Sequence, residues 1–136
     1  MADIDENLVT VLAADDTVSA ITTNIDINAT PESDSIPFIW IQQIDEEDVG
    51  RDLDSGGLPI FTFVVECVST SLSESKDLKA AAQAELDNKT GSFGDQNIAW
   101  AEVSAVDDTY ENRNPYGDNG DLHVSAFIVE IGVDGR

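Results

Sequence analysis

The sequence is short of the residues on which disulfides and metal sites depend. It holds one cysteine, Cys67, and one histidine, His123, in 136 residues. A single thiol cannot form an internal disulfide, and one imidazole cannot build a cluster of histidine ligands. We therefore expect neither a zinc site nor cysteine–histidine catalysis. Cys67 is expected to be a small buried strand residue and His123 an ordinary residue on the surface of a strand.

Basic residues are also scarce, and they are scattered along the chain. Six lysines and arginines stand against 28 aspartates and glutamates, which gives a formal net charge of -22. A phosphate backbone or an anionic membrane surface is bound through clustered Lys and Arg. The composition therefore argues against direct binding of nucleic acid or membrane. Salt screens repulsion between like charges, so we expect the stability of the fold to fall at very low ionic strength.

Long apolar runs are missing too. The longest, residues 36–41, is interrupted by Pro37, and it is far shorter than the roughly 20 residues that a membrane-spanning helix needs. Residues 1–6 are acidic and lack the cationic start of a secretory signal. We expect a protein that does not cross a membrane and that is synthesised in the cytosol.

The chain does have enough apolar residues to build a core. Hydrophobic residues make up 41% of it, which separates it from the low-hydrophobicity composition of disordered chains. Its length suits one domain, residues 1–136. Two settings would favour such acidity in a folded protein: a saline habitat, or a function that must not stick to DNA.

Helical patterns occur in two regions. Over residues 4–12 the apolar side chains return at helical spacing, and Asp15 then caps a short further turn. Residues 71–74 have the Ser-x-x-Glu spacing of a capping box, and residues 76–89 are rich in good helix formers. Gly91 is placed where a glycine commonly ends a helix. We predict a bent first helix and a long second one.

Four segments have the β-branched and aromatic content, or the alternation, of strands: residues 38–44, 58–70, 98–106 and 122–133. Residues 24–30 predict a short strand or an extended loop, and residues 45–57 and 107–121 predict long polar loops. The elements follow the order α-β-β-α-β-β. We predict an α+β fold, a two-layer α/β sandwich with an antiparallel four-stranded sheet and helices on one face.

No motif indicates catalysis or a resident metal. Gly-x-Ser-x-Gly, the phosphate-binding loop and His-Glu-x-x-His are all absent from the sequence. An EF-hand that starts at Asp52 fails because its twelfth position is Phe63. Asp118, Asn119 and Asp121 could bind a divalent ion weakly, although a solvated turn explains them more simply. We expect no enzyme activity, no cofactor and no high-affinity metal site.

Several fragments follow one another in a specific order. They are residues 36–42, 54–57, 61–67, 73–78 and 108–111. In this order they resemble the tail completion family of long-tailed double-stranded DNA bacteriophages, the tail terminators that cap the tail tube. The similarity covers most of the chain, although this sequence is far more acidic and has fewer arginines than many members.

The resemblance implies a structural virion protein of the phage neck, assembled in the host cytoplasm. It implies a homohexameric ring that ends polymerisation of the tail tube protein and docks the tail onto the head connector or stopper protein. DNA would pass through the lumen without specific binding. Six copies would carry six times -22, or -132, in charge, so we expect ring closure to require salt, divalent cations or the tail tube as a template.

Closing a ring requires contacts between different surfaces of neighbouring subunits. Exposed strand edges and long hairpin loops are the surfaces that the predicted fold offers. We expect the subunit interface to include six loop residues: Arg51, Leu53, Asp54, Tyr110, Arg113 and Tyr116. The two arginines are rare cations in a negative field and could pair with acids of the next subunit, or be simple surface charges.

Three other interpretations remain open at this point. An acidic DNA mimic would inhibit a nucleic-acid-binding protein by presenting carboxylates in place of phosphates. A binding module from a salt-loving organism would have the same composition, and a hydrolase without a recognised motif is the third. Binding to a basic protein would favour the mimic, whereas turnover abolished by one carboxylate substitution would favour the enzyme.

Overall fold

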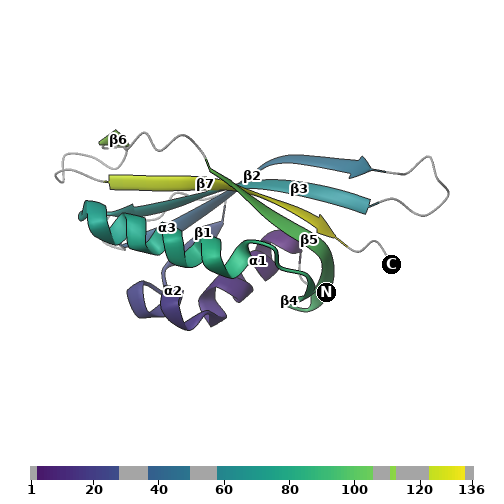
Figure 1. The fold of residues 1–136 in the computed structure, drawn as a ribbon, viewed down its shortest axis with the longest axis horizontal. Helices are drawn as coiled ribbons and strands as arrows, with labels where there is room; N and C mark the ends of the chain where they lie inside the picture. The colour runs from purple at the N-terminus through teal and green to yellow at the C-terminus, as the bar shows by residue number, and fades with distance from the viewer. Residues whose placement is uncertain (1–2, 28–36, 50–57, 106–110, 113–122, 134–136) are drawn as a thin grey trace.

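The protein is a curled sheet with helices packed against one of its faces (Figure 1). The computed structural model describes residues 3–27, 37–49, 58–105, 111–112 and 123–133. The helices in this part of the chain are α1 (Ile4–Ala14), α2 (Asp16–Ile21) and α3 (Leu72–Leu86). The strands are β1 (Ile25–Ile27), β2 (Phe38–Val49), β3 (Leu58–Ser69), β4 (Gly91–Phe93), β5 (Gln96–Ala105), β6 (Glu111–Asn112) and β7 (His123–Val133). None of these helices is long and apolar enough to cross a membrane.

The α+β class agrees with the prediction, and the four predicted strands are present as β2, β3, β5 and β7, but the four-stranded antiparallel sheet is wrong. Within the described residues the sheet has seven strands in the order β1-β2-β3-β7-β5-β4, with β6 added beside β7. The pairings are antiparallel except that of β1, which runs parallel to β2. β1 lies within residues 24–30, for which a short strand or an extended loop was predicted. The strands that were missed, β4 and β6, have three and two residues, too few to show a period of two.

The second error concerns residues 45–49, which were predicted to be part of a loop. They continue β2, and they pair in register with β3 as far as Val49 opposite Leu58. A bulge at Ile44 shifts the register, and this side chain is 54% exposed. Four consecutive acids suggested a loop because charged residues are rare in strands, yet an antiparallel ladder satisfies their backbone groups whatever the side chains.

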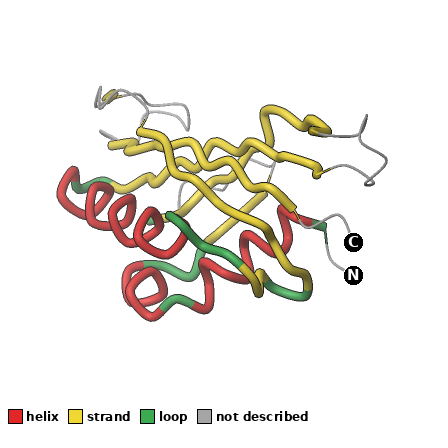
Figure 2. Tube along the Cα trace, turned by 45° about the vertical axis from the view of Figure 1, so that its right-hand side comes forward, coloured by secondary structure: helices red, strands yellow, loops and turns green. Residues whose placement is uncertain are grey.

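The two N-terminal helices form as their sequence indicates. Leu8 and Leu12 of α1 are fully buried, and the Asp15 carboxylate accepts a hydrogen bond of 2.9 Å from the backbone N–H of Val18 at the start of α2. The first helix contacts both β1 and β4, the two ends of the strand order. The sheet therefore curls around α1, as Figures 1 and 2 show.

One half of the predicted capping box is present at the start of α3. Ser71 Oγ accepts from the backbone N–H of Glu74 at 3.3 Å. The returning half is replaced, because the Glu74 carboxylate accepts from Ser69 Oγ at 2.6 Å and Ser69 Oγ accepts from the Ser71 N–H at 3.0 Å. Ser69 is fully buried, so the buried hydroxyl takes the place that a direct Glu74–Ser71 bond would have had.

The end of α3 differs from the prediction, because Gly91 does not stop it. The helix ends at Leu86, and Asn88 adopts the left-handed conformation with φ of 61°. The Asn88 N–H then donates to the Ala101 carbonyl at 3.0 Å, and the Asp87 carboxylate accepts from the Val103 N–H at 3.3 Å. These bonds cover the outer edge of β5, which would otherwise present unpaired backbone groups.

The main core lies between the helices and the inner face of the sheet. It joins residues of all three helices to the inward-facing residues of the strands, and its largest members include Phe63 and Phe127, both fully buried. Cys67 is a buried strand residue of this core, as predicted. Burial raises the pKa of its thiol well above the usual range. His123 is half-buried and begins β7.

Candidate assembly surfaces

All six residues predicted at the subunit interface lie outside the described residues: Arg51, Leu53, Asp54, Tyr110, Arg113 and Tyr116. The same holds for Asp118, Asn119 and Asp121, the weak metal candidates. The described strands end on either side of these segments, β2 and β3 at the Val49–Leu58 pair. The contacts expected of the six residues therefore stay predictions.

One group of acids in the described part of the chain has the spacing of metal ligands. Asp3, Asp5 and Glu6 at the start of α1 place their carboxylate oxygens within 4.8 Å of one another. Two of these carboxylates accept hydrogen bonds from backbone N–H groups at the helix terminus. Glu6 Oε1 accepts from the Asp3 N–H at 3.1 Å, and Asp5 Oδ1 accepts from the Glu6 N–H at 2.7 Å. Capping of the orphan N–H groups of α1 accounts for this cluster.

The face of the sheet away from the helices is covered by no described helix. Side chains of β2, β3, β5 and β7 that alternate with core residues form this surface, which we call the outer sheet face. All of its members are half-buried or exposed: Trp40, Gln42, Ile60, Thr62, Val64, Glu66, Trp100, Glu102, Ser104, Ala126, Ile128 and Glu130. At one end it meets a small second cluster of Phe38, Val68 and Val124.

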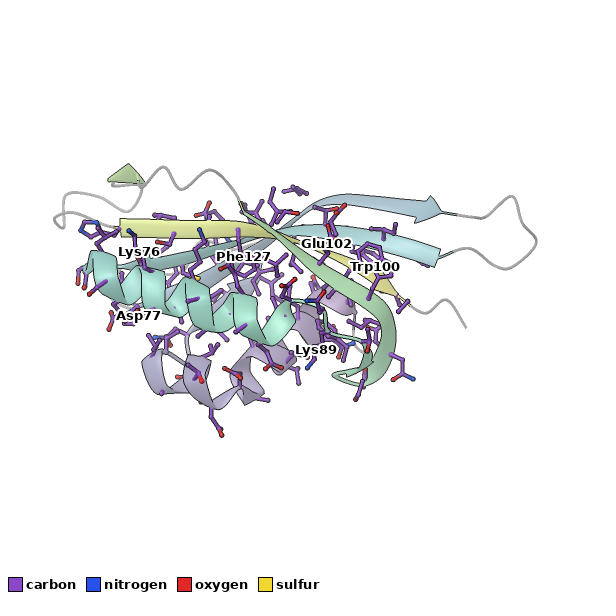
Figure 3. All side chains as sticks on the ribbon, in the orientation of Figure 1. Lys76, Asp77, Lys89, Trp100, Glu102 and Phe127 are labelled. Carbon is purple, nitrogen blue, oxygen red and sulfur yellow. The ribbon has the colours of Figure 1, made fainter. Side chains whose placement is uncertain are left out.

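The outer sheet face mixes apolar side chains with acids. Glu102 and Glu130 lie directly opposite each other on β5 and β7, and Glu66 lies further along β3. Trp100 crosses close above Gly132, where an added Cβ would lie 2.4 Å from the indole nitrogen. Figure 3 shows Trp100 and Glu102 along β5, whereas Phe127 lies between the sheet and α3. Trp is enriched at contacts between proteins, and the apolar side chains of this face offer another protein a surface to cover.

The cations of the described residues are all found in or just after α3: Lys76, Lys79 and Lys89. Lys89 is bound to Glu85 at 2.9 Å. None of the described strands contains a lysine or an arginine. The two layers therefore differ in charge, with acids alone on the sheet and the lysines on the helical side.

The sequence analysis overlooked the outer sheet face because it considered strand edges and hairpin loops as contact surfaces, and all six residues that it named lie in loops. The alternation that defines this face is visible in β3, where Thr62, Val64 and Glu66 alternate with core residues. Glu130 follows the same period in β7. What the sequence could not supply is the register that brings Glu102 opposite Glu130, because it depends on the pairing of strands far apart in the chain.

Comparison with known proteins identifies the family. The model of the family described as "Tail completion protein gp17" matches residues 6–128, which is most of the chain. The protein belongs to this tail completion family. Membership confirms the resemblance carried by the sequence fragments, and it makes the protein a structural component of a bacteriophage virion tail.

A solved structure supports the fold of this tail completion protein. A chain from the "Virion of native gene transfer agent (GTA) particle" superimposes with a TM-score of 0.65, covering 93% of this chain and 90% of that one at 12% sequence identity. At that identity the likeness concerns the fold alone. No curated protein matches the chain in sequence.

Proposed function

We propose that this tail completion protein forms a homohexameric ring at the head–tail joint. The ring ends polymerisation of the tail tube and docks the tail onto the head connector. The observation that carries the proposal is the family match over residues 6–128. The uncovered outer sheet face is consistent with it, because a subunit of a ring needs two different surfaces for its two neighbours.

The chemistry of the described residues supports a structural role without catalysis. The one acidic group with metal-ligand spacing serves as a helix cap. The thiol of Cys67 is buried, and burial raises its pKa, which makes a nucleophilic thiolate unfavourable. These groups offer no convergent set for acid–base or nucleophilic chemistry. The function proposed here therefore rests on contacts between proteins.

The net charge gives the proposed ring a property and a requirement. A ring of this composition would repel DNA that passes through its lumen. The same charge opposes closure, because six subunits bring -132 together, six times -22. At about 0.15 M salt the Debye length is about 8 Å, which screens most of this repulsion. We therefore expect a monomer in dilute buffer and rings in salt or magnesium.

Sedimentation velocity and negative-stain imaging test the ring. The purified protein is examined at high concentration, with and without magnesium and in low and high salt. Hexamers with a central hole are expected in the screened conditions. Virions assembled without the protein should carry tails of excess and variable length that fail to join heads. Tails of normal length in virions that lack the protein would contradict the terminator role.

The charge of -22 favours one second candidate, a DNA mimic that inhibits a nucleic-acid-binding protein. Such a mimic acts as a dispersed protein and binds a basic partner through carboxylates spaced like phosphates. Nuclease inhibition by a species that stays monomeric in all salts would support it. Rings without inhibition would support the terminator.

A further inference from the structure

One flank of α3 carries lysines and no acid. Residues at spacings of four, seven and eleven line up along one side of a helix. In α3 this row, which we call the cationic stripe, is formed by Leu72, Lys76, Lys79 and Gln83. Lys76 is exposed and the other three are half-buried. In a chain with 28 acids and six bases, a row of this kind is the place where a negative surface could approach.

The cationic stripe is turned away from the other two helices. Glu85, on the opposite flank of α3, lines a shallow groove together with Val11 of α1 and Thr17 of α2. The buried row of α3, which includes Leu78 and Leu86, lies between the two flanks: Glu85 is on one side of it and the cationic stripe is on the other. It therefore leaves a lysine-bearing side of the helical layer uncovered by α1 and α2. Figure 3 shows Lys76 and Asp77 in the first half of α3.

The outer sheet face carries the complementary charge. Glu102 and Glu130 are direct cross-strand neighbours, and like charges in that position destabilise a sheet. Among the described residues no cation forms an ion pair with either of them. A cation brought by another molecule would remove this repulsion, and Trp100 and Ile128 supply apolar surface around it.

We propose that the cationic stripe of one copy docks against the outer sheet face of the next, with Lys76 and Lys79 facing Glu102 and Glu130. This inference rests on the proposed ring and names the surfaces that join its subunits. The stripe and the sheet face are two different surfaces on one molecule, so the contact is heterologous and propagates from subunit to subunit until the ring closes. It also places a cation beside Glu102 and Glu130, which otherwise face each other as like charges.

Charge substitutions separate this contact from general repulsion. Glu102→Lys and Asp77→Lys both change the net charge from -22 to -20, and both sites are exposed. If only overall repulsion mattered, both variants would assemble better than the parent chain. Docking predicts instead that Glu102→Lys weakens assembly at least about tenfold in dissociation constant, whereas Asp77→Lys, which lies off the stripe, does not weaken it.

The reversed pair gives the second half of the test. Lys76→Glu should weaken assembly by a similar factor, and combining Lys76→Glu with Glu102→Lys should restore it. Sedimentation velocity in the salt and magnesium in which the parent chain assembles measures all four variants, and circular dichroism checks that each is folded. Lys76 is at an exposed helix position, so Lys76→Glu should fold. It therefore tests the contact even if Glu102→Lys does not fold.

The outcomes distinguish the docking contact from the ring itself. If the parent chain forms hexamers and Glu102→Lys and Lys76→Glu do so equally well, the docking contact is wrong and the ring stands. If the parent chain stays monomeric in every condition, the ring fails and the docking contact fails with it. If each single substitution weakens assembly and the combined variant assembles like the parent chain, the contact is supported. Two substitutions that merely destabilised the fold would not restore assembly when combined.

Discussion

Asn7 joins the first helix to the hairpin of β4 and β5, and its removal should cost a large part of the stability. The side chain is 2% exposed. Its amide nitrogen donates to Asp95 Oδ1 at 3.0 Å and to Gln96 Oε1 at 2.5 Å, and its oxygen accepts from the Asp95 N–H at 3.1 Å. A hydrogen bond of this kind contributes about 0.5–1.5 kcal/mol, and a buried group left without a partner costs about 1–3 kcal/mol.

Asn7→Ala removes all three bonds, so we expect the free energy of unfolding to fall by about 2–3 kcal/mol. For a chain of this length each kcal/mol corresponds to about 3–4 °C, which gives a decrease in Tm of about 6–12 °C. Urea denaturation and differential scanning calorimetry measure both quantities. Asn97→Ala is the matched control, because Asn97 is an exposed residue of the same hairpin and its loss should cost less than about 0.5 kcal/mol.

The isosteric variant Asn7→Asp sharpens the test. It places a carboxylate against the oxygens of Asp95 and Gln96, where the amide had donated. The pKa of the new carboxyl should rise in the folded state, so its contribution to stability is lost as the pH rises above about 3.9, the unfolded value. The difference from the parent chain should therefore be larger at pH 7 than at pH 4. An Asn7→Ala variant as stable as Asn97→Ala would refute the whole account.

Three further predictions concern the rest of the molecule. The Tm should rise as sodium chloride increases from millimolar to near-molar concentration, because salt screens the charge of -22; a flat curve would count against self-repulsion. Cys67 is buried and its thiol pKa is raised by that burial, so a thiol reagent should label it only on unfolding, and rapid labelling of the native protein would contradict its position. Gly132→Ala would put a Cβ against the indole of Trp100, so we expect changed tryptophan fluorescence and a loss of about 1–3 kcal/mol; an unchanged spectrum would show that the ring lies elsewhere.

The elements with long, regular patterns were predictable from the sequence. Leu78, Ala82 and Leu86 recur at helical spacing and are buried in α3, and the pattern of residues 58–70 predicted the strand that is β3. Helix caps were predictable as far as they depend on neighbours in sequence, as at Asp15. These features are local, so the residues that cause them lie within one turn or one strand of each other.

The features that sequence reasoning missed depend on distant partners. Residues 45–49 are strand because β3 pairs with them, and Glu74 bonds to Ser69 in place of Ser71 because Ser69 is buried beneath it. The facing pair of Glu102 and Glu130 arises from the register of β5 on β7. The family resemblance suggested an assembly, but which surfaces carry which charge follows only from the topology.

The curl of the sheet around α1 bears on the way the chain is made. α1 leaves the ribosome well before β4 and β5, yet Asn7 meets Asp95 across a separation of 88 residues. The side of α1 that packs against the β4–β5 hairpin stays unpaired until that hairpin has been synthesised. Contacts this distant in sequence slow folding, so a subunit becomes fit for incorporation only after the β4–β5 hairpin has emerged. Truncated or stalled chains would thus be kept out of the particle.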